Sequence, residues 1–117
     1  MCRRGDIYYV DFGKSDGSKQ GGIRPALIVS NNRANKNSPV ITVVPLTARI
    51  WKKQYLPTHV RIYGNGLKKP SMALAEQVET LDKCNLKEKI GEVVDNTVME
   101  QVTVALQVQI GVFEKYN

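Results

Sequence analysis

Short apolar runs separated by strong turn signals are the feature that most limits how this chain folds. Runs rich in β-branched and aromatic residues are typical of strands, and clusters of glycine, proline, asparagine and aspartate end them. We predict strands over residues 6–12, 26–30, 40–46 and 58–62. Residues 71–75 and 77–81 form one interrupted strand or two short strands, and residues 86–94 are ambiguous. About six short strands before one helix predict a mostly β, α+β fold, in which a small antiparallel barrel is closed or flanked by that helix.

The C-terminal segment carries the one convincing helical pattern. Asp95 or Asn96 can cap the helix, because either side chain can accept a hydrogen bond from an amide of the first turn. Apolar residues then recur at spacings of three or four, which places them on one helix face: Val98, Val102, Ala105, Leu106, Ile110 and Phe113. We interpret this stripe as core, or as core together with a self-association surface.

Length and composition indicate a single folded domain over residues 1–117, with 42% apolar residues. No apolar run approaches the length of a membrane span, and the N-terminus has no hydrophobic signal core, so we expect a cytoplasmic protein. The two cysteines, Cys2 and Cys84, and the single histidine have no metal-binding spacing. The sequence therefore predicts no metal and no cofactor.

The formal net charge of +6 is unevenly distributed. Residues 1–70 contain thirteen Lys and Arg against three Asp and Glu, whereas residues 71–117 contain four against eight. A basic segment followed by an acidic one favours a face that binds a polyanion. Solubility alone is the alternative explanation.

A glycine-rich loop that ends in Arg24 and Pro25 leads into the second predicted strand. Glycines let a backbone approach a phosphate closely. Pro25 favours an extended conformation at Arg24, so the guanidinium, whose N–H donors match a phosphate, is displayed from a stiff point. The alternative is an ordinary hairpin loop with Arg24 as a surface charge.

If the ligand is RNA, Arg24 can stabilise the negative charge that develops on the phosphorus. Thr47 follows the third predicted strand, where strand ends and loops gather, but its hydroxyl is a poor acid or base without Arg24 nearby. His59 alternates with Val60 in a strand pattern, and we interpret it as structural. Metal-assisted cleavage would need clustered carboxylates, and the acidic residues lie mostly in the helix-proximal third.

A basic loop with aromatic residues follows Thr47. Such loops suit single-stranded RNA, because unpaired bases stack on the rings while cations contact phosphates. The aromatic residues are Trp51 and Tyr55, and the cations between them are Lys52 and Lys53.

These motifs, in this order, resemble the MazF/PemK family of toxin endoribonucleases, most closely the Gram-positive EndoA type. The most specific element is Gly-Gly-x-Arg-Pro at residues 21–25, preceded by Ser-x-Gln at residues 18–20. The matching segments are residues 4–8, 17–25, 44–48, 56–60 and 75–83, so the resemblance covers nearly the whole chain.

The resemblance implies an SH3-like antiparallel β-barrel with a C-terminal α-helix, the CcdB/PemK-like toxin fold, working as a homodimer. It implies the toxin of a type II toxin–antitoxin system, a sequence-specific, metal-independent and ribosome-independent endoribonuclease. Such an enzyme cleaves single-stranded mRNA to 2′,3′-cyclic phosphate and 5′-hydroxyl ends and arrests growth. The implied partner is a MazE-like antitoxin whose acidic, flexible tail occupies the RNA groove.

By the same resemblance, Arg24 and Thr47 are the catalytic pair. The positions implied to bind RNA or read its bases are Ser18, Gln20, Leu56 and Gln77. Lys19 departs from the family pattern, since this position is often acidic in near relatives, and we add it to the predicted RNA-binding residues with Trp51, Lys52 and Lys53.

Two other functions stay open at this point. A CcdB-like gyrase-inhibiting toxin without nuclease activity would depend on the end of the helix, residues 109–117, and not on Arg24. A non-catalytic RNA-binding barrel would bind RNA without turnover. The motif around Arg24 favours the endoribonuclease over both.

Overall fold

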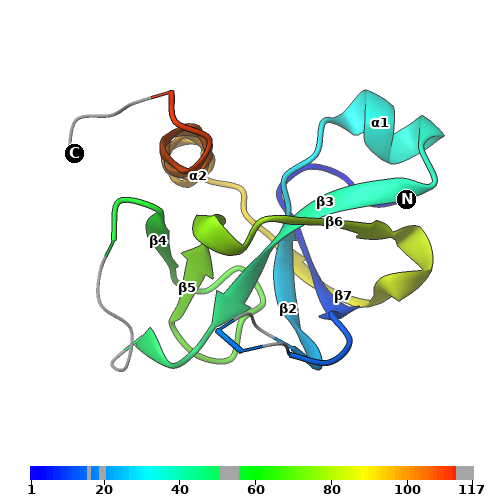
Figure 1. Ribbon diagram of the computed structural model, residues 1–117, viewed down its shortest axis with the longest axis horizontal. Coiled ribbons are helices and arrows are strands. Elements are labelled where there is room, and N and C mark those ends of the chain that lie inside the picture. The colour runs from blue at the N-terminus through cyan, green and yellow to red at the C-terminus, as the bar shows by residue number, and fades with distance from the viewer. Residues whose placement is uncertain (16, 19–20, 51–55, 113–117) are drawn as a thin grey trace.

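The computed structural model describes residues 1–15, 17–18, 21–50 and 56–112. The predicted class is confirmed, because the chain is mostly antiparallel sheet with one long helix at its C-terminal end (Figure 1). In chain order the elements are β1 (Asp6–Asp11), β2 (Ile23–Ile28), α1 (Asn32–Asn37), β3 (Val40–Thr47), β4 (His59–Ile62), β5 (Ser71–Leu74), the one-turn 3-10 helix η2 (Ala75–Gln77), β6 (Glu79–Asp82), a second such turn η3 (Lys83–Asn85), β7 (Leu86–Glu92) and α2 (Asn96–Gln109).

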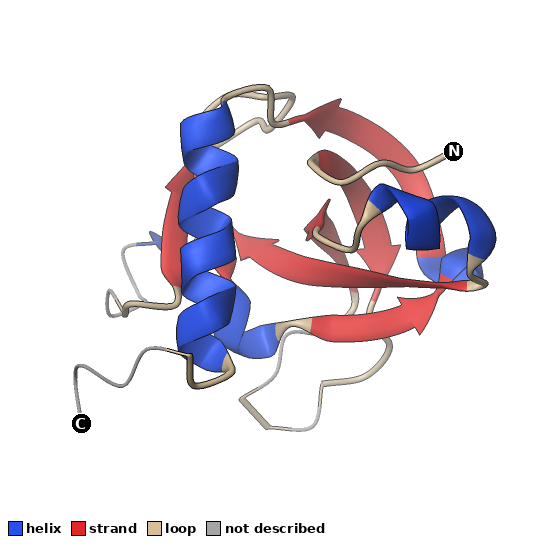
Figure 2. Cartoon of the chain, turned by 90° about the horizontal axis from the view of Figure 1, so that it is seen from above, coloured by secondary structure: helices blue, strands red, loops and turns tan. Residues whose placement is uncertain are grey.

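The strands form one antiparallel sheet in the order β4-β5-β3-β2-β1-β7, with β6 paired to β3 off this path. β3 is the longest strand and runs through the middle of the molecule. β2 pairs with one of its edges, and β6 and then β5 pair with the other. The helix α2 lies across one side of the bent sheet, as Figure 2 shows from above.

Two clusters of buried apolar side chains fill the space on the two faces of β2 and β3. The first contains Leu27 and Leu46 and continues to Val102 and Ala105 of α2. The second contains, among others, Ile28 with Val43. Because both faces are covered, β2 and β3 read as continuous apolar runs in the sequence, without alternation.

The cap of α2 is Asp95, whose side chain accepts a hydrogen bond of 2.8 Å from the amide of Thr97. The predicted stripe is confirmed from Val98 to Leu106, whose apolar members are buried or pack against the first cluster. Ile110 is 73% exposed because the helix ends at Gln109, so it does not belong to the core of this chain, and the predicted self-association surface stays a prediction. Phe113 lies outside the described residues.

The helix α1 lies between two predicted strands, in a polar stretch where the sequence analysis predicted no helix. Its stability comes from polar side chains and not from an apolar stripe, so hydrophobic periodicity does not reveal it. Asn31 accepts a hydrogen bond from the amide of Ala34 at 2.8 Å. The buried Asn35 donates to the carbonyl of Ser30 at 2.8 Å and accepts from the Ser30 hydroxyl at 2.5 Å.

The second strand begins at Ile23, three residues earlier than predicted, and ends at Ile28. Arg24 and Pro25 therefore belong to the sheet and not to the loop before it. They lie opposite Val10 and Tyr9 of β1. An early start of β2 fixes the position of Arg24 by strand pairing.

The β4–β5 loop is held against β7 by a close backbone contact between two glycines. A Cβ on Gly91 would overlap the carbonyl of Asn65, and a Cβ on Gly66 would overlap the carbonyl of Ile90. Gly66 also has a φ of +92°, which favours glycine. This contact places residues 67–70 beside the end of the sheet.

We predict that Gly91→Ala lowers the free energy of unfolding by about 1–3 kcal/mol, because the added methyl group forces two backbone segments apart. Chemical denaturation checks this. Glu88→Ala, at an exposed position of the same strand, is the control and should change stability by no more than about 0.5 kcal/mol. A Gly91→Ala variant as stable as that control would contradict the close contact.

Candidate functional site

Arg24 lies at the start of β2, where the β1–β2 loop enters the sheet. Its side chain is partly buried, and its Nε donates a hydrogen bond of 2.6 Å to the carbonyl of Gly21. The amide of Phe12 donates to the carbonyl of Gly22, so the base of the loop continues the β1–β2 pairing. Arg24 is thus held both by the strand pairing of its backbone and by the hydrogen bond of its side chain.

Thr47 is the last residue of β3, and it is only 3% exposed. Its Oγ1 accepts a hydrogen bond of 3.2 Å from the amide of Arg49. The β2–β3 pairing ends at Ala26 and Pro45, and the same register continued by two residues would set Arg24 opposite Thr47. Residues that face each other on neighbouring antiparallel strands project to the same side of the sheet. The two predicted catalytic residues therefore lie at the ends of neighbouring strands and project to the same side of the sheet.

The other predicted RNA-binding residues fall into two places. Ser18 is exposed in the β1–β2 loop. Leu56, 39% exposed, precedes β4, and Gln77 ends η2. The remaining predicted residues, together with Tyr55, lie outside the described part of the chain: Lys19, Gln20, Trp51, Lys52 and Lys53.

Glu76 ties Leu56 and Gln77 into one unit, and the sequence analysis missed it. Its two carboxylate oxygens accept from the Thr58 hydroxyl at 2.8 Å and contact Nε2 of His59 at 3.1 Å. We refer to these contacts of Glu76 with Thr58 and His59 as the Glu76 clamp. The amide of Ala75 donates to the carbonyl of Thr58 at 3.0 Å, beside this clamp. The one available sequence signal is that Glu76 precedes Gln77 in a segment that resembles the family.

His59 is buried, with 2% of its side chain exposed, and its Nε2 is engaged by Glu76. Its Nδ1 has no hydrogen-bond partner within the described part of the chain. Burial and the contact with Glu76 favour the structural role predicted for His59.

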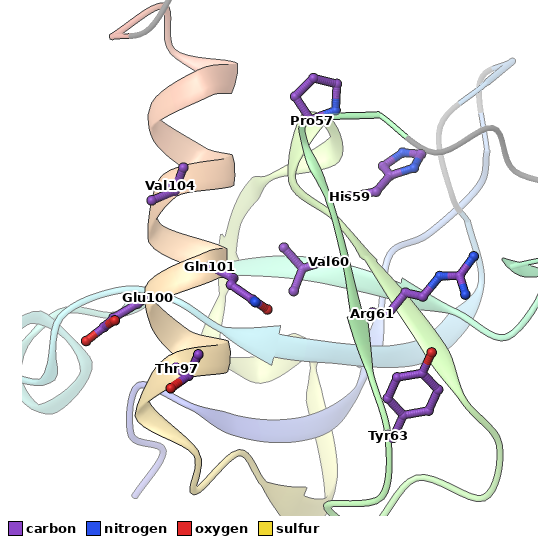
Figure 3. A pocket seen from close by; sticks show the side chains of 9 residues that line it. All are labelled: Pro57, His59, Val60, Arg61, Tyr63, Thr97, Glu100, Gln101 and Val104. Atoms are coloured by element: carbon purple, nitrogen blue, oxygen red, sulfur yellow. The ribbon is translucent and has the colours of Figure 1, made fainter.

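A pocket of about 670 Å³ lies between α2 and the edge strand β4 (Figure 3). Val60 and Gln101 point toward each other across the gap, whereas Arg61 and Tyr63 leave β4 on the other side. Its lining includes neither Arg24 nor Thr47. This larger pocket is therefore separate from the predicted catalytic pair.

A second pocket, of about 220 Å³, lies beside that pair, and we refer to it as the strand-end pocket. Pro25 and Ala48, the residues that follow Arg24 and Thr47, form part of its wall. It is lined by Tyr9, Pro25, Ala48, Gly66, Leu67, Lys68, Lys69, Ser71 and Ile90. It differs from the pocket between α2 and β4 in having two lysines and no carboxylate in its described lining, whereas Glu100 lines the other pocket.

Two observations concern the chemistry that the site could support. No group of three or more His, Cys, Asp and Glu side chains is arranged to hold a metal ion among residues 1–15, 17–18, 21–50 and 56–112. Burial, with Asp6 and Cys2 nearby, raises the pKa of the Tyr8 hydroxyl, so Tyr8 is protonated at neutral pH and is not a base.

None of the helices in the described part of the chain is long and apolar enough to span a membrane.

Comparison with known proteins identifies the class. A family model of PemK-like, MazF-like toxins of type II toxin–antitoxin systems matches residues 3–110. An endoribonuclease MazF of Staphylococcus saprophyticus is 44% identical over 113 residues, which cover 95% of this chain and 92% of that protein. A mycobacterial endoribonuclease, solved in complex with its cognate antitoxin, is 30% identical with a TM-score of 0.80, over 97% of this chain and 99% of that one.

A MazF from Deinococcus radiodurans shares the fold, with a TM-score of 0.79 and 24% identity over 94% of this chain and 96% of that one. The antiparallel sheet with its C-terminal helix is thus the fold of small toxins from toxin–antitoxin systems. The chain belongs to the PemK-like, MazF-like family of these type II toxins.

We predict that Glu76→Ala lowers the free energy of unfolding by about 1–3 kcal/mol, since it leaves the buried Thr58 hydroxyl and His59 ring without their shared acceptor. Thermal and chemical denaturation check the loss. Glu100→Ala, which removes an exposed carboxylate from α2, is the matched control. Equal stability of the two variants would show that the clamp contributes nothing.

Proposed function

We propose that this toxin is a sequence-specific, metal-independent endoribonuclease that cuts single-stranded mRNA without the ribosome and so arrests growth. The observation that supports the proposal is the pairing of β2 with β3, which puts Arg24 and Thr47 two residues beyond the last pair, Ala26 and Pro45, at the ends of neighbouring strands. The 44% identity to an endoribonuclease MazF supports the same class of reaction.

In the proposed reaction the ribose 2′-oxygen attacks the adjacent phosphorus while its proton is removed. The P–O5′ bond breaks, and the departing oxygen takes up a proton. The products are therefore a 2′,3′-cyclic phosphate and a 5′-hydroxyl end, and no water is consumed. Arg24 stabilises the charge on the phosphorane, because a guanidinium anchored before the reaction loses little free energy in reorganising. Thr47 takes part in the proton transfer.

The basic loops beside this pair also suit an acidic peptide. We propose that the partner is a MazE-like antitoxin whose flexible acidic tail occupies the RNA groove and blocks it. The complex of the mycobacterial relative with its cognate antitoxin supports this assignment. The working form is proposed to be a homodimer in the cytoplasm.

Arg24→Ala should lower the rate of cleavage of a long single-stranded RNA by at least about 10²-fold, because one charge-stabilising donor group is lost. Thr47→Ala should also abolish cleavage, whereas Thr47→Ser keeps a hydroxyl and should keep part of the activity. Arg33→Ala on the exposed face of α1 is the control for the lost charge, and circular dichroism checks the fold. Full activity of Arg24→Ala would overturn the assignment.

Cleavage should continue at an unchanged rate in excess EDTA, and mapping of the ends should give cyclic phosphates and 5′-hydroxyls. Loss of activity on chelation, restored by a divalent ion, would contradict the metal-independent reaction. If the RNA stays intact under all conditions, a gyrase supercoiling assay and an RNA-binding assay distinguish the two other functions.

A further inference from the structure

We propose that the strand-end pocket is a subsite for one nucleotide flanking the scissile phosphate, with Lys68 and Lys69 at its phosphate and Tyr9 against its base. This inference rests on the proposed function, since it assigns part of the same substrate. It adds a second contact surface on the opposite side of the sheet from the catalytic pair.

The first argument is position. Arg24 and Pro25 are consecutive in β2, so their side chains leave the sheet on opposite faces. One residue advances a strand by about 3.3 Å, so the wall of the pocket begins one backbone step from Arg24 and from Thr47. In Figure 1 the start of β2, the end of β3 and the β4–β5 loop lie together at the lower end of the molecule. A strand of RNA held at the pair therefore reaches the pocket by passing over the strand ends.

The second argument is chemistry. Tyr9 lies directly opposite Pro25 in the β1–β2 pairing, so its ring stands on the pocket side of the sheet. Aromatic rings stack on any base, and lysines bind phosphate as point charges. Lys68 and Lys69 are both exposed at the rim, whereas no carboxylate lines the described wall. An aromatic ring beside two cations fits a nucleotide better than it fits an acidic peptide.

The third argument is that the loop is built into place. Gly66 packs onto the backbone of Ile90, and the amide of Leu67 donates to the carbonyl of Gly64 at 3.0 Å. The Ser71 hydroxyl donates to the carbonyl of Lys69, also at 3.0 Å. The lysines thus extend from a backbone that is fixed on both sides. A volume of about 220 Å³ is below the ~300–1,000 Å³ of pockets for larger ligands, which suits one base with its sugar.

The experiment compares two double variants that lose the same charge. Lys68→Ala with Lys69→Ala removes the rim, and Lys36→Ala with Lys87→Ala removes two exposed lysines outside the pocket. Each double variant is made in the wild-type chain, and its cleavage of a single-stranded oligoribonucleotide is measured. Each is also made with Thr47→Ala, so that binding of the intact oligonucleotide can be measured by fluorescence anisotropy.

We expect the rim variant to raise KM and weaken binding about 3–30-fold with little change in kcat, beyond any effect of the control pair. Its binding should also depend less on salt, with the slope of log K against log salt reduced by about 0.7 for the one phosphate that the two lysines contact. Equal effects of the two double variants would overturn the proposal. So would a rim variant that loses binding only to an acidic ten-residue peptide.

A second measurement tests the base. Replacing the flanking nucleotide with an abasic one should weaken binding about 5–100-fold in the Thr47→Ala chain, but little further once Tyr9→Leu is also present. Tyr9→Phe keeps the ring and should behave like tyrosine. Independent effects of the two changes would overturn the stacking contact. Binding is measured without turnover, so it tests the subsite independently of cleavage. Absence of cleavage by the wild-type chain would count against the proposed function and would leave the binding result interpretable.

Discussion

The pairing of β3 along both of its edges is the constraint on which the rest of the structure depends. β2 pairs with one edge at Val43–Pro45, while β6 and β5 pair with the other at Val40–Val43 and Leu46–Thr47. Both faces are also covered by the two apolar clusters. A slip of one residue would exchange the faces of every side chain and would turn Thr47 away from Arg24. The core therefore sets the register that the site needs.

This dependence explains how far the sequence could predict the molecule. The strand at residues 40–46 and the Asp95 cap are local signals, since an unbroken apolar run or a capping side chain acts within a few residues. The placement of Arg24 relative to Thr47 is not local, because it depends on a register between segments more than twenty residues apart. Resemblance to a family could suggest that pair, but periodicity could not. The helix α1 was missed for another reason, because buried polar bonds of Asn35 stabilise it in place of an apolar face.

The clamp at Glu76 shows the same limit for polar residues. A glutamate beside a glutamine in a polar stretch is typical of a solvated surface. Its position is set by Thr58 and His59, seventeen or more residues away, which contact its two oxygens. Buried polar groups are costly unless they are paired, so this network can hold η2 against the start of β4 in one arrangement. The residues predicted to contact RNA on that side, Leu56 and Gln77, take their positions from it.

The uneven charge acts on a ligand over a long range, whereas the residues at the strand ends act only by direct contact. Attraction between a basic face and a polyanion is long-range and nearly independent of sequence, so it brings RNA to the loop end without selecting a base. Selection needs contact, and the two faces of the same strand ends divide the contacts: Arg24 and Thr47 on one side, Tyr9 with the lysine rim on the other. Because one short stretch of backbone carries both sets, a nucleotide seated in the strand-end pocket fixes where the next phosphate lies relative to Arg24. In this arrangement the contact that recognises a flanking nucleotide also positions the scissile bond.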